Sequence, residues 1–140
     1  MKIKKILSID YGIKRCGLSI TNNSNDLAIG LSCVKTNEIF NYLDLIIKKE
    51  NVHIIVLGYP KKLNNKNQYI TNMVLKFKKL IIKLYPNLII DLIDERYTSK
   101  IAKLYLNSIS MSKKYLKEKI NILSSTLILQ SYLKINKKKI

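Results

Sequence analysis

Glycine, proline, cysteine and histidine are all scarce in this sequence. With only 4 glycines and 2 prolines in 140 residues, it contains no long flexible linker, and its length suits one domain. Two cysteines, Cys16 and Cys33, and a single histidine, His53, are too few for the usual zinc-ligand spacings. They also argue against disulfides and favour buried thiols in a reducing compartment. We therefore expect a cytoplasmic protein without structural zinc.

Long apolar runs and acidic residues are also few. No run approaches the roughly 18 apolar residues that a membrane span needs, and the N-terminal apolar run stops at Asp10, too soon for an export signal. Only 9 acidic residues stand against 26 basic ones, which gives a net charge of +17. A surface this basic attracts phosphate backbones. Nucleic acid is therefore the favoured partner, although A/T-rich codons, which favour Lys, Ile and Asn, also contribute to the charge.

Arginine is the scarcer of the two strong bases. Of the 26 Lys and Arg residues, only Arg15 and Arg96 are arginine. Arginine alone offers a planar fork of donors that matches a phosphate with two hydrogen bonds. These two residues are therefore candidate phosphate contacts.

The pattern of apolar residues predicts alternating strands and helices of an α/β protein. The segment 52–60 is rich in β-branched residues, as is typical of a central parallel strand buried on both faces. The order of elements implies one five-stranded mixed sheet, antiparallel at one edge and parallel at the other, with helices on both faces. We expect a domain over 1–134 and a basic, frayed tail over 135–140. The predicted strands are 3–9, 15–21, 29–34, 52–60 and 88–94, and the predicted helices are 37–49, 69–85, 99–106 and 112–133.

Three carboxylates stand at strand ends. Asp10 ends the first predicted strand, and Asp94 and Glu95 end the fifth. Sites in parallel α/β sheets form at the carboxyl ends of the strands, where these acids can approach one another. Clustered carboxylates repel unless a cation lies between them, and oxygen ligands suit Mg²⁺ or Mn²⁺, which can promote phosphodiester hydrolysis. The alternative is that Asp10 caps a tight turn and Asp94 pairs with a lysine.

The two neighbouring acids of the fifth strand cannot both face the site. Adjacent strand residues alternate faces, so one of Asp94 and Glu95 can serve the metal while the other anchors Arg96 or caps the next helix. Thr98 and Ser99 stand where a helix N-cap belongs. A helix start there offers free N–H groups to a phosphate.

Four segments together resemble the YqgF family, also called the RuvX or Holliday-junction-resolvase-like family. They are "DYGIKRCGLSI", "VLGYPKKLNNK", "LIDERYTSKIA" and "LSSTLILQSYL", in that order, and they extend from about residue 5 to residue 133. The resemblance implies a ribonuclease H-like fold and a metal-dependent nuclease that trims the 5′ end of the 16S ribosomal RNA precursor. Cleavage of four-way DNA junctions is an older suggestion for the family, and the sequence scarcely separates the two substrates.

The resemblance also implies roles for the residues of the first motif. Asp10 would be a metal-binding carboxylate, and Gly12 a turn through which the backbone approaches the substrate. Lys14 and Arg15 would face phosphates. Lys117, in a basic stretch later in the chain, is open to two interpretations, a phosphate contact or a solvated face.

The "DERYTS" motif supplies the remaining implied roles. Glu95 is the preferred second carboxylate, with Asp94 as the alternative. Arg96 would position the acid or the substrate, and Thr98 would cap the next helix and bind substrate there.

The chain departs from the family at Asn121, where the last helix normally carries a third acid. Asn121 would share a helix face with Ser124 and Ser125, small residues that let the helix lie close to the sheet. An amide oxygen can ligate Mg²⁺ without contributing charge, so the resemblance implies a metal set of Asp10, Glu95 and Asn121 with weakened affinity.

Two further functions follow from these residues. Loss of the third acid favours a catalytically weakened RNA-binding factor in ribosome maturation. The "DYGIKRCGLS" motif also resembles the phosphate loop of the actin, Hsp70 and sugar-kinase superfamily, but those enzymes need two such domains, for which 140 residues leave no room. We expect a monomer or homodimer that binds RNA in preference to DNA and does not bind membranes.

Overall fold

The computed structural model describes residues 3–60, 65–94 and 113–137. Five strands and three α-helices are present in these ranges, with one 3-10 turn between β3 and α1. The elements are β1 (Lys5–Asp10), β2 (Arg15–Thr21), β3 (Ala28–Lys35), η1 (Thr36–Glu38), α1 (Ile39–Lys49), β4 (Val52–Tyr59), α2 (Asn65–Leu84), β5 (Ile89–Asp94) and α4 (Lys113–Lys137).

The strands form one mixed sheet in the order β3-β2-β1-β4-β5. The pairs β1–β2 and β2–β3 are antiparallel, whereas β1–β4 and β4–β5 are parallel. The predicted mixed sheet is therefore confirmed. Strand β4 lies between β1 and β5, in agreement with the apolar, β-branched character of its sequence.

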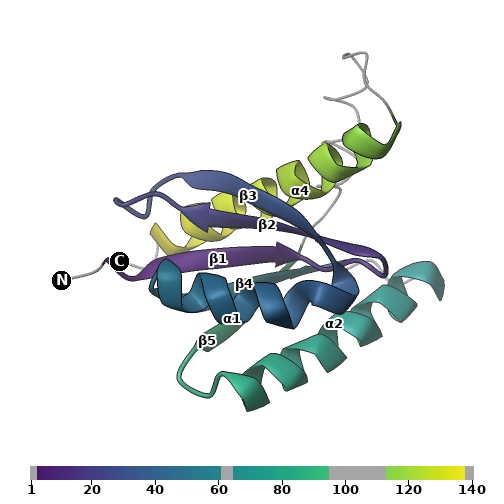
Figure 1. Cartoon of the computed structure of the whole chain (residues 1–140), viewed down its shortest axis with the longest axis horizontal. Coiled ribbons are helices and arrows are strands. Elements are labelled where there is room, and N and C mark those ends of the chain that lie inside the picture. The colour runs from purple at the N-terminus through teal and green to yellow at the C-terminus, as the bar shows by residue number, and fades with distance from the viewer. Residues whose placement is uncertain (1–2, 61–64, 95–112, 138–140) are drawn as a thin grey trace.

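Helices cover both faces of the sheet, as predicted. In Figure 1, α1 and α2 lie on the side of the sheet nearer the viewer, and α4 crosses behind β2 and β3. The C-terminal helix, the last described element, thus packs on the strands that come first in the chain. This arrangement brings residues near 10, 17, 33 and 121 together.

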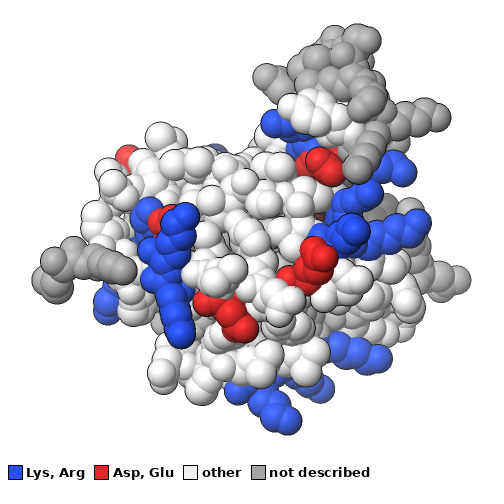
Figure 2. Space-filling model, viewed as in Figure 1, with Lys and Arg blue, Asp and Glu red and all other residues white. Residues whose placement is uncertain are grey.

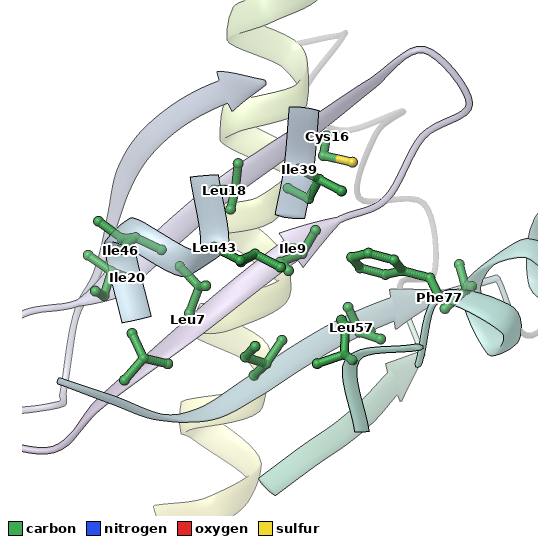
Figure 3. Packing of buried hydrophobic residues seen from close by; sticks show 14 residues of the cluster. Leu7, Ile9, Cys16, Leu18, Ile20, Ile39, Leu43, Ile46, Leu57 and Phe77 are labelled. Carbon is green, nitrogen blue, oxygen red and sulfur yellow. The ribbon is translucent and has the colours of Figure 1, made fainter. Parts of the chain in front are cut away.

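The main core lies between the sheet and the α1/α2 layer. Its members are aliphatic side chains that are almost fully buried, together with Phe77 of α2 and Cys16 of β2 (Figure 3). On the opposite face a smaller cluster joins Val56 and Ile93 of the sheet to Ile128 and Tyr132 of α4. Because successive residues of a strand point to opposite faces, each strand contributes side chains to both clusters.

Element boundaries differ from the predicted ones mainly at helix ends. Helix α2 begins at Asn65, four residues before the predicted start at residue 69, and α4 continues to Lys137, beyond the predicted end at residue 133. Helical structure thus includes residues 135–137 of the expected frayed tail. The helix predicted over 99–106 lies outside the described residues.

Both cysteines carry free thiols, Cys16 buried and Cys33 partly buried. Within the described ranges, none of the helices combines the length and apolarity that crossing a membrane requires.

Candidate functional site

Asp10 is the last residue of β1 and lies on the face of the sheet that α4 covers. Two residues earlier on the same strand, Ser8 donates a hydrogen bond from Oγ to the carbonyl oxygen of Ser125 in α4, at 3.0 Å. Residues two apart on a strand share a face, so the Asp10 side chain is on the α4 side, where it is half-buried. Its antiparallel partner is Gly17 of β2.

Gly17 lets the backbone of α4 touch the sheet beside Asp10. A Cβ atom at this position would lie 1.9 Å from the carbonyl oxygen of Asn121, far inside van der Waals contact. The same approach is fixed by Ser19, whose Oγ donates to the carbonyl oxygen of Ser125 at 2.9 Å. Ser124 and Ser125 are fully buried. The predicted close packing of the small-residue face of this helix is confirmed.

The side chain of Asn121 extends toward β3. Its Nδ2 atom lies 3.7 Å from the Sγ atom of Cys33, and Cys33 is the β3 partner of Gly17. Asp10 and Cys33 therefore lie on either side of Gly17, with the helix backbone above the glycine. The amide group of Asn121 is on the Cys33 side of this row, away from β1.

Cys33 shares its surroundings with several charged groups of the candidate site. Burial is the main cause that raises the pKa of the Cys33 thiol, and the carboxylates of Glu118 and Asp10 raise this pKa further. The Asn121 amide and the Arg15 guanidinium act in the opposite direction. The thiol therefore stays protonated at neutral pH, and it is a packing group rather than a nucleophile.

The turn between β1 and β2, which carries Lys14 and Arg15, has a backbone that is fixed by several contacts. A Cβ at Gly12 would lie 2.4 Å from the carbonyl oxygen of Arg15, so this glycine is needed for the turn to close on its own chain. Thr36 ties the turn to the end of β3, because its Oγ1 donates to the Gly12 carbonyl at 2.7 Å and its N–H donates to the Lys14 carbonyl at 3.0 Å. Lys14 is exposed and Arg15 is half-buried.

Lys35 is a cation at this turn that sequence reasoning missed. It is the β3 partner of Arg15 and lines a surface pocket together with Lys14 and Arg15. The predicted third strand stops at residue 34, and only the register of the β2–β3 pair identifies the next residue as the neighbour of Arg15. Figure 2 shows Lys and Arg side chains gathered at the right-hand edge, where Figure 1 has the β1–β2 turn. Lys117 is exposed on α4.

Asp94 faces the opposite side of the sheet from Asp10. Its β4 partner Tyr59 and its strand neighbour Leu92 both pack against the core under α1 and α2. Ile93, which lies between Leu92 and Asp94 in β5, belongs instead to the cluster under α4. Asp91, on the same side as Ile93, accepts a hydrogen bond from the hydroxyl of Tyr132 and so links β5 to α4.

Oxygen donors at this strand end are of the kind that Mg²⁺ and Mn²⁺ prefer, but the described residues supply only part of a set. Asp10 contributes a carboxylate, and the Asn121 backbone lies above the neighbouring strand. Over the ranges 3–60, 65–94 and 113–137, no three His, Cys, Asp or Glu residues are grouped closely enough to hold a metal ion. Glu95, Arg96, Thr98 and Ser99 lie outside these ranges.

Two solved structures resemble this chain in fold at low sequence identity. The RuvC protein of T. thermophilus, in complex with a Holliday junction substrate, matches with a TM-score of 0.57 and 13% identity over 96% of both chains. The yeast mitochondrial Holliday junction resolvase Ydc2 matches with a TM-score of 0.53 and 14% identity, over 94% of this chain and 78% of the other. The predicted ribonuclease H-like fold is thereby confirmed.

Closer relatives share sequence over nearly the whole chain. A protein of Karelsulcia muelleri is 44% identical over 94% of this chain and 99% of its own length, and one of Amoebophilus asiaticus is 40% identical over 92% and 93%. Each bears the name "Putative pre-16S rRNA nuclease". The model of the family described as "RuvX: Holliday junction resolvase" matches residues 4–135. The family match over residues 4–135 and the identity to these relatives show that the chain belongs to the RuvX family.

Proposed function

We propose that this chain is a metal-dependent endonuclease that hydrolyses phosphodiester bonds in structured RNA, and that it processes the 5′ end of the 16S ribosomal RNA precursor in the cytoplasm. The substrate is supported by relatives that bear the name "Putative pre-16S rRNA nuclease", among them those of Karelsulcia muelleri and Amoebophilus asiaticus. The observation that supports the chemistry best is the position of Asp10, at the carboxyl end of β1, facing α4 and at the start of the turn that leads to Lys14 and Arg15.

Asp10 and Glu95 are the carboxylates that hold the divalent ion in this proposal. Glu95 is preferred to Asp94 because Asp94 shares its face with Leu92 and Tyr59, on the other side of the sheet from Asp10. When bound, Mg²⁺ or Mn²⁺ lowers the pKa of a coordinated water and stabilises the charge that develops on the phosphate.

The chain's own cations bind and orient the substrate. Lys14 and Arg15 contact backbone phosphates, and the guanidinium of Arg15 provides two parallel donors for one phosphate. Arg96 positions the acid or the substrate, and Thr98 caps the next helix and binds substrate there, as the family resemblance implies. The hydrogen bonds of Thr36 fix the turn before substrate binds, which lowers the entropic cost of ordering the cations.

A second candidate function is RNA binding with little or no catalysis. The observation that favours it is the direction of the Asn121 amide, which contacts Cys33 on β3 instead of extending toward Asp10. The family's third acid is thus replaced by a neutral group that is used in packing. A DNA-junction nuclease is a third candidate, supported by the likeness to RuvC.

An RNA cleavage assay with Mg²⁺ or Mn²⁺ tests the proposal. The substrate is a 5′-extended 16S precursor fragment, with a four-way DNA junction as a parallel arm, and the proteins are wild type, Asp10→Asn and Asn121→Asp. We expect wild type to cut the RNA and Asp10→Asn to lose about a hundredfold or more, because even residues that only orient metal ligands contribute about 10–100-fold.

A calorimetric Mn²⁺ titration of the same proteins gives a readout independent of cleavage. Asn121→Asp replaces the amide that contacts Cys33 with a carboxylate, which a divalent ion at Asp10 would attract, so this variant should bind Mn²⁺ more tightly than wild type, and Asp10→Asn should bind it more weakly. Cleavage by Asn121→Asp alone would favour the RNA-binding factor, and cleavage confined to the junction would favour the DNA nuclease. Equal cleavage by wild type and Asp10→Asn would show that Asp10 is not part of the active site and would contradict the proposal.

A further inference from the structure

Beside the Asp10 site, the β1–β2 turn and the end of β3 enclose a small basic pocket of about 330 Å³. Three of the five residues that line it are cations, and none is acidic. The lining residues are Ile13, Lys14, Arg15, Lys35 and Asn37. The pocket is a concave surface of one charge sign, which is the kind that concentrates anions.

The backbone of this pocket is fixed by contacts within the described residues. Arg15 and Lys35 are direct partners in the antiparallel β2–β3 pair. Immediately after Lys35, Thr36 donates one hydrogen bond to the Lys14 carbonyl and another to the Gly12 carbonyl. The strand pair and the turn thus fix the backbone positions from which the three cationic side chains extend.

Placing Arg15 directly opposite Lys35 is unfavourable for the isolated protein. Like charges at paired strand positions destabilise a sheet. Among the residues that the structure describes, none of the three cations has a carboxylate within ion-pairing distance. Glu38 and Glu118 line the adjoining pocket, which shares Arg15 and Lys35, but they do not line this one. A bound anion would relieve the repulsion between the paired cations.

Another lysine of the sheet has a different environment. Lys5 donates to the carboxylate of Glu50 at 3.0 Å, and both side chains are largely shielded from solvent. That charge is already balanced within the protein. Lys5 thus differs from the cations at the β1–β2 turn, whose charges are not paired with a carboxylate of the described residues and can interact with a ligand.

We propose that Lys35, with Lys14 and Arg15, forms a subsite for a backbone phosphate of the nucleic acid, adjacent to the phosphate that is cleaved. From strand spacing and rise, the subsite lies about 10 Å from Asp10, too far to share the reacting phosphate. Arg15 supplies the planar fork, and the two lysines supply point charges around it. The inference rests on the proposed function only in taking nucleic acid as the ligand, and phosphate is common to RNA and DNA.

Binding measurements without metal test this subsite apart from catalysis. Fluorescence anisotropy in EDTA follows a labelled RNA hairpin and a DNA hairpin of the same sequence, each from 50 to 400 mM salt, with wild type, Lys35→Gln and Lys35→Arg. The matched control is Lys48→Gln, which removes one exposed lysine in the last turn of α1, at the other end of the sheet.

Lys35→Gln should weaken binding by about fivefold and lower the salt slope by about 0.7 to 0.9, the value for one phosphate contact. Lys35→Arg should bind as wild type does, and Lys48→Gln should change the slope by less than half as much. If Lys35→Gln and Lys48→Gln are indistinguishable, the subsite is wrong. Equal losses on both hairpins assign the contact to phosphate, and a loss on only one hairpin would overturn a backbone contact.

Cleavage kinetics separate this inference from the nuclease proposal. With an active wild type, Lys35→Gln should raise KM and leave kcat within about twofold, because the residue binds away from the reacting phosphate. If wild type binds RNA with the predicted Lys35 dependence but does not cut it, the nuclease proposal fails and the subsite stands. If wild type cuts and Lys35→Gln has an unchanged KM and salt slope, the subsite fails and the nuclease stands.

Discussion

The two faces of the sheet differ in the size of the side chains that cover them. Under α1 and α2 the strands present large apolar residues such as Leu7, Ile9 and Leu18, each fully buried. Under α4 the adjacent positions of the same strands are Ser8 and Gly17, with Ser19 and Gly30 nearby. Bulky residues keep α1 and α2 a full side chain away from the sheet, whereas small ones bring the backbone of α4 into contact with it.

The two faces therefore contribute differently: one provides most of the folding stability, and the other sets the position of α4. The apolar face removes most of the buried hydrocarbon from water, which is the main favourable term in folding. The small-residue face holds α4 by specific contacts, since Ser8 and Ser19 both donate to the Ser125 carbonyl. The candidate site lies on this second face, where the position of residue 121 relative to Asp10 is fixed by backbone contact.

Adding a methyl group at Gly17 should have the largest effect on the α4 face. In Gly17→Ala, the new Cβ would meet the Asn121 carbonyl at 1.9 Å, and the helix backbone cannot move aside as a flexible side chain could. We expect a loss of about 2–3 kcal/mol in the free energy of unfolding, within the range for overpacked cores. Urea denaturation followed by circular dichroism measures it.

Gly30→Ala is the matched control for that variant. Its Cβ would lie 2.6 Å from Cγ2 of Ile122, a side-chain methyl group whose movement leaves the helix backbone in place, whereas at Gly17 the clash is with the backbone itself. We expect a loss of less than about 1 kcal/mol. Equal losses for the two variants would contradict the claim that backbone contact at Gly17 sets the position of α4.

Ionisation of the two thiols, one on each face of the sheet, should have a smaller effect on stability. The effect appears as a fall in the free energy of unfolding at alkaline pH. Burial raises the pKa of Cys16 above its ordinary value of 9.0, so the folded state holds this proton more tightly than the unfolded state does. The resulting stability is complete below about pH 9 and is lost as the pH rises through the raised pKa of the folded state. We expect the free energy of unfolding to fall as the pH rises above about 9, by at most about 1.4 kcal/mol per pH unit for one group.

Variants of each thiol compare the faces directly. Cys16→Ala should reduce the slope of this fall without abolishing it, because one titrating group under α1 and α2 is gone while Tyr11 and Tyr42, whose pKa values are also raised by burial, remain. Cys33→Ala should flatten it less, since Cys33 is only partly buried and Arg15 and Asn121 oppose the rise in its pKa. Denaturation curves at several pH values give the slopes, and identical slopes for all three proteins would show that neither thiol is shifted enough to matter.

Most of the fold could be predicted from the sequence because its periodicities are strong. The β-branched run of β4 and the apolar spacing of α1 each correspond to one element in the structure. The close approach of α4 was also predictable, from Ser124 and Ser125. The end of α4 was not, because its basic last turn, Lys134–Lys137, resembles a tail in composition.

The parts of the site that could not be predicted depend on strand register. Lys35 becomes the neighbour of Arg15, and Cys33 the contact of Asn121, only through the pairing of β2 with β3. Sequence alternation predicts that Asp94 and Glu95 face opposite sides, but it does not predict which face Asp94 occupies. Packing of Leu92 and Ile93 on opposite clusters assigns Asp94 to the far face.

The central claim is that the reaction takes place on the α4 face of the sheet, and comparison of Asp10→Asn with Asp94→Asn tests it most directly. Each variant removes one carboxylate charge from a strand end, and initial rates on the 5′-extended 16S precursor are normalised to the folded fraction measured by circular dichroism. The account predicts that Asp10→Asn loses about a hundredfold or more, whereas Asp94→Asn stays within about threefold of wild type. A folded Asp94→Asn protein as inactive as Asp10→Asn, or a fully active Asp10→Asn, would contradict it.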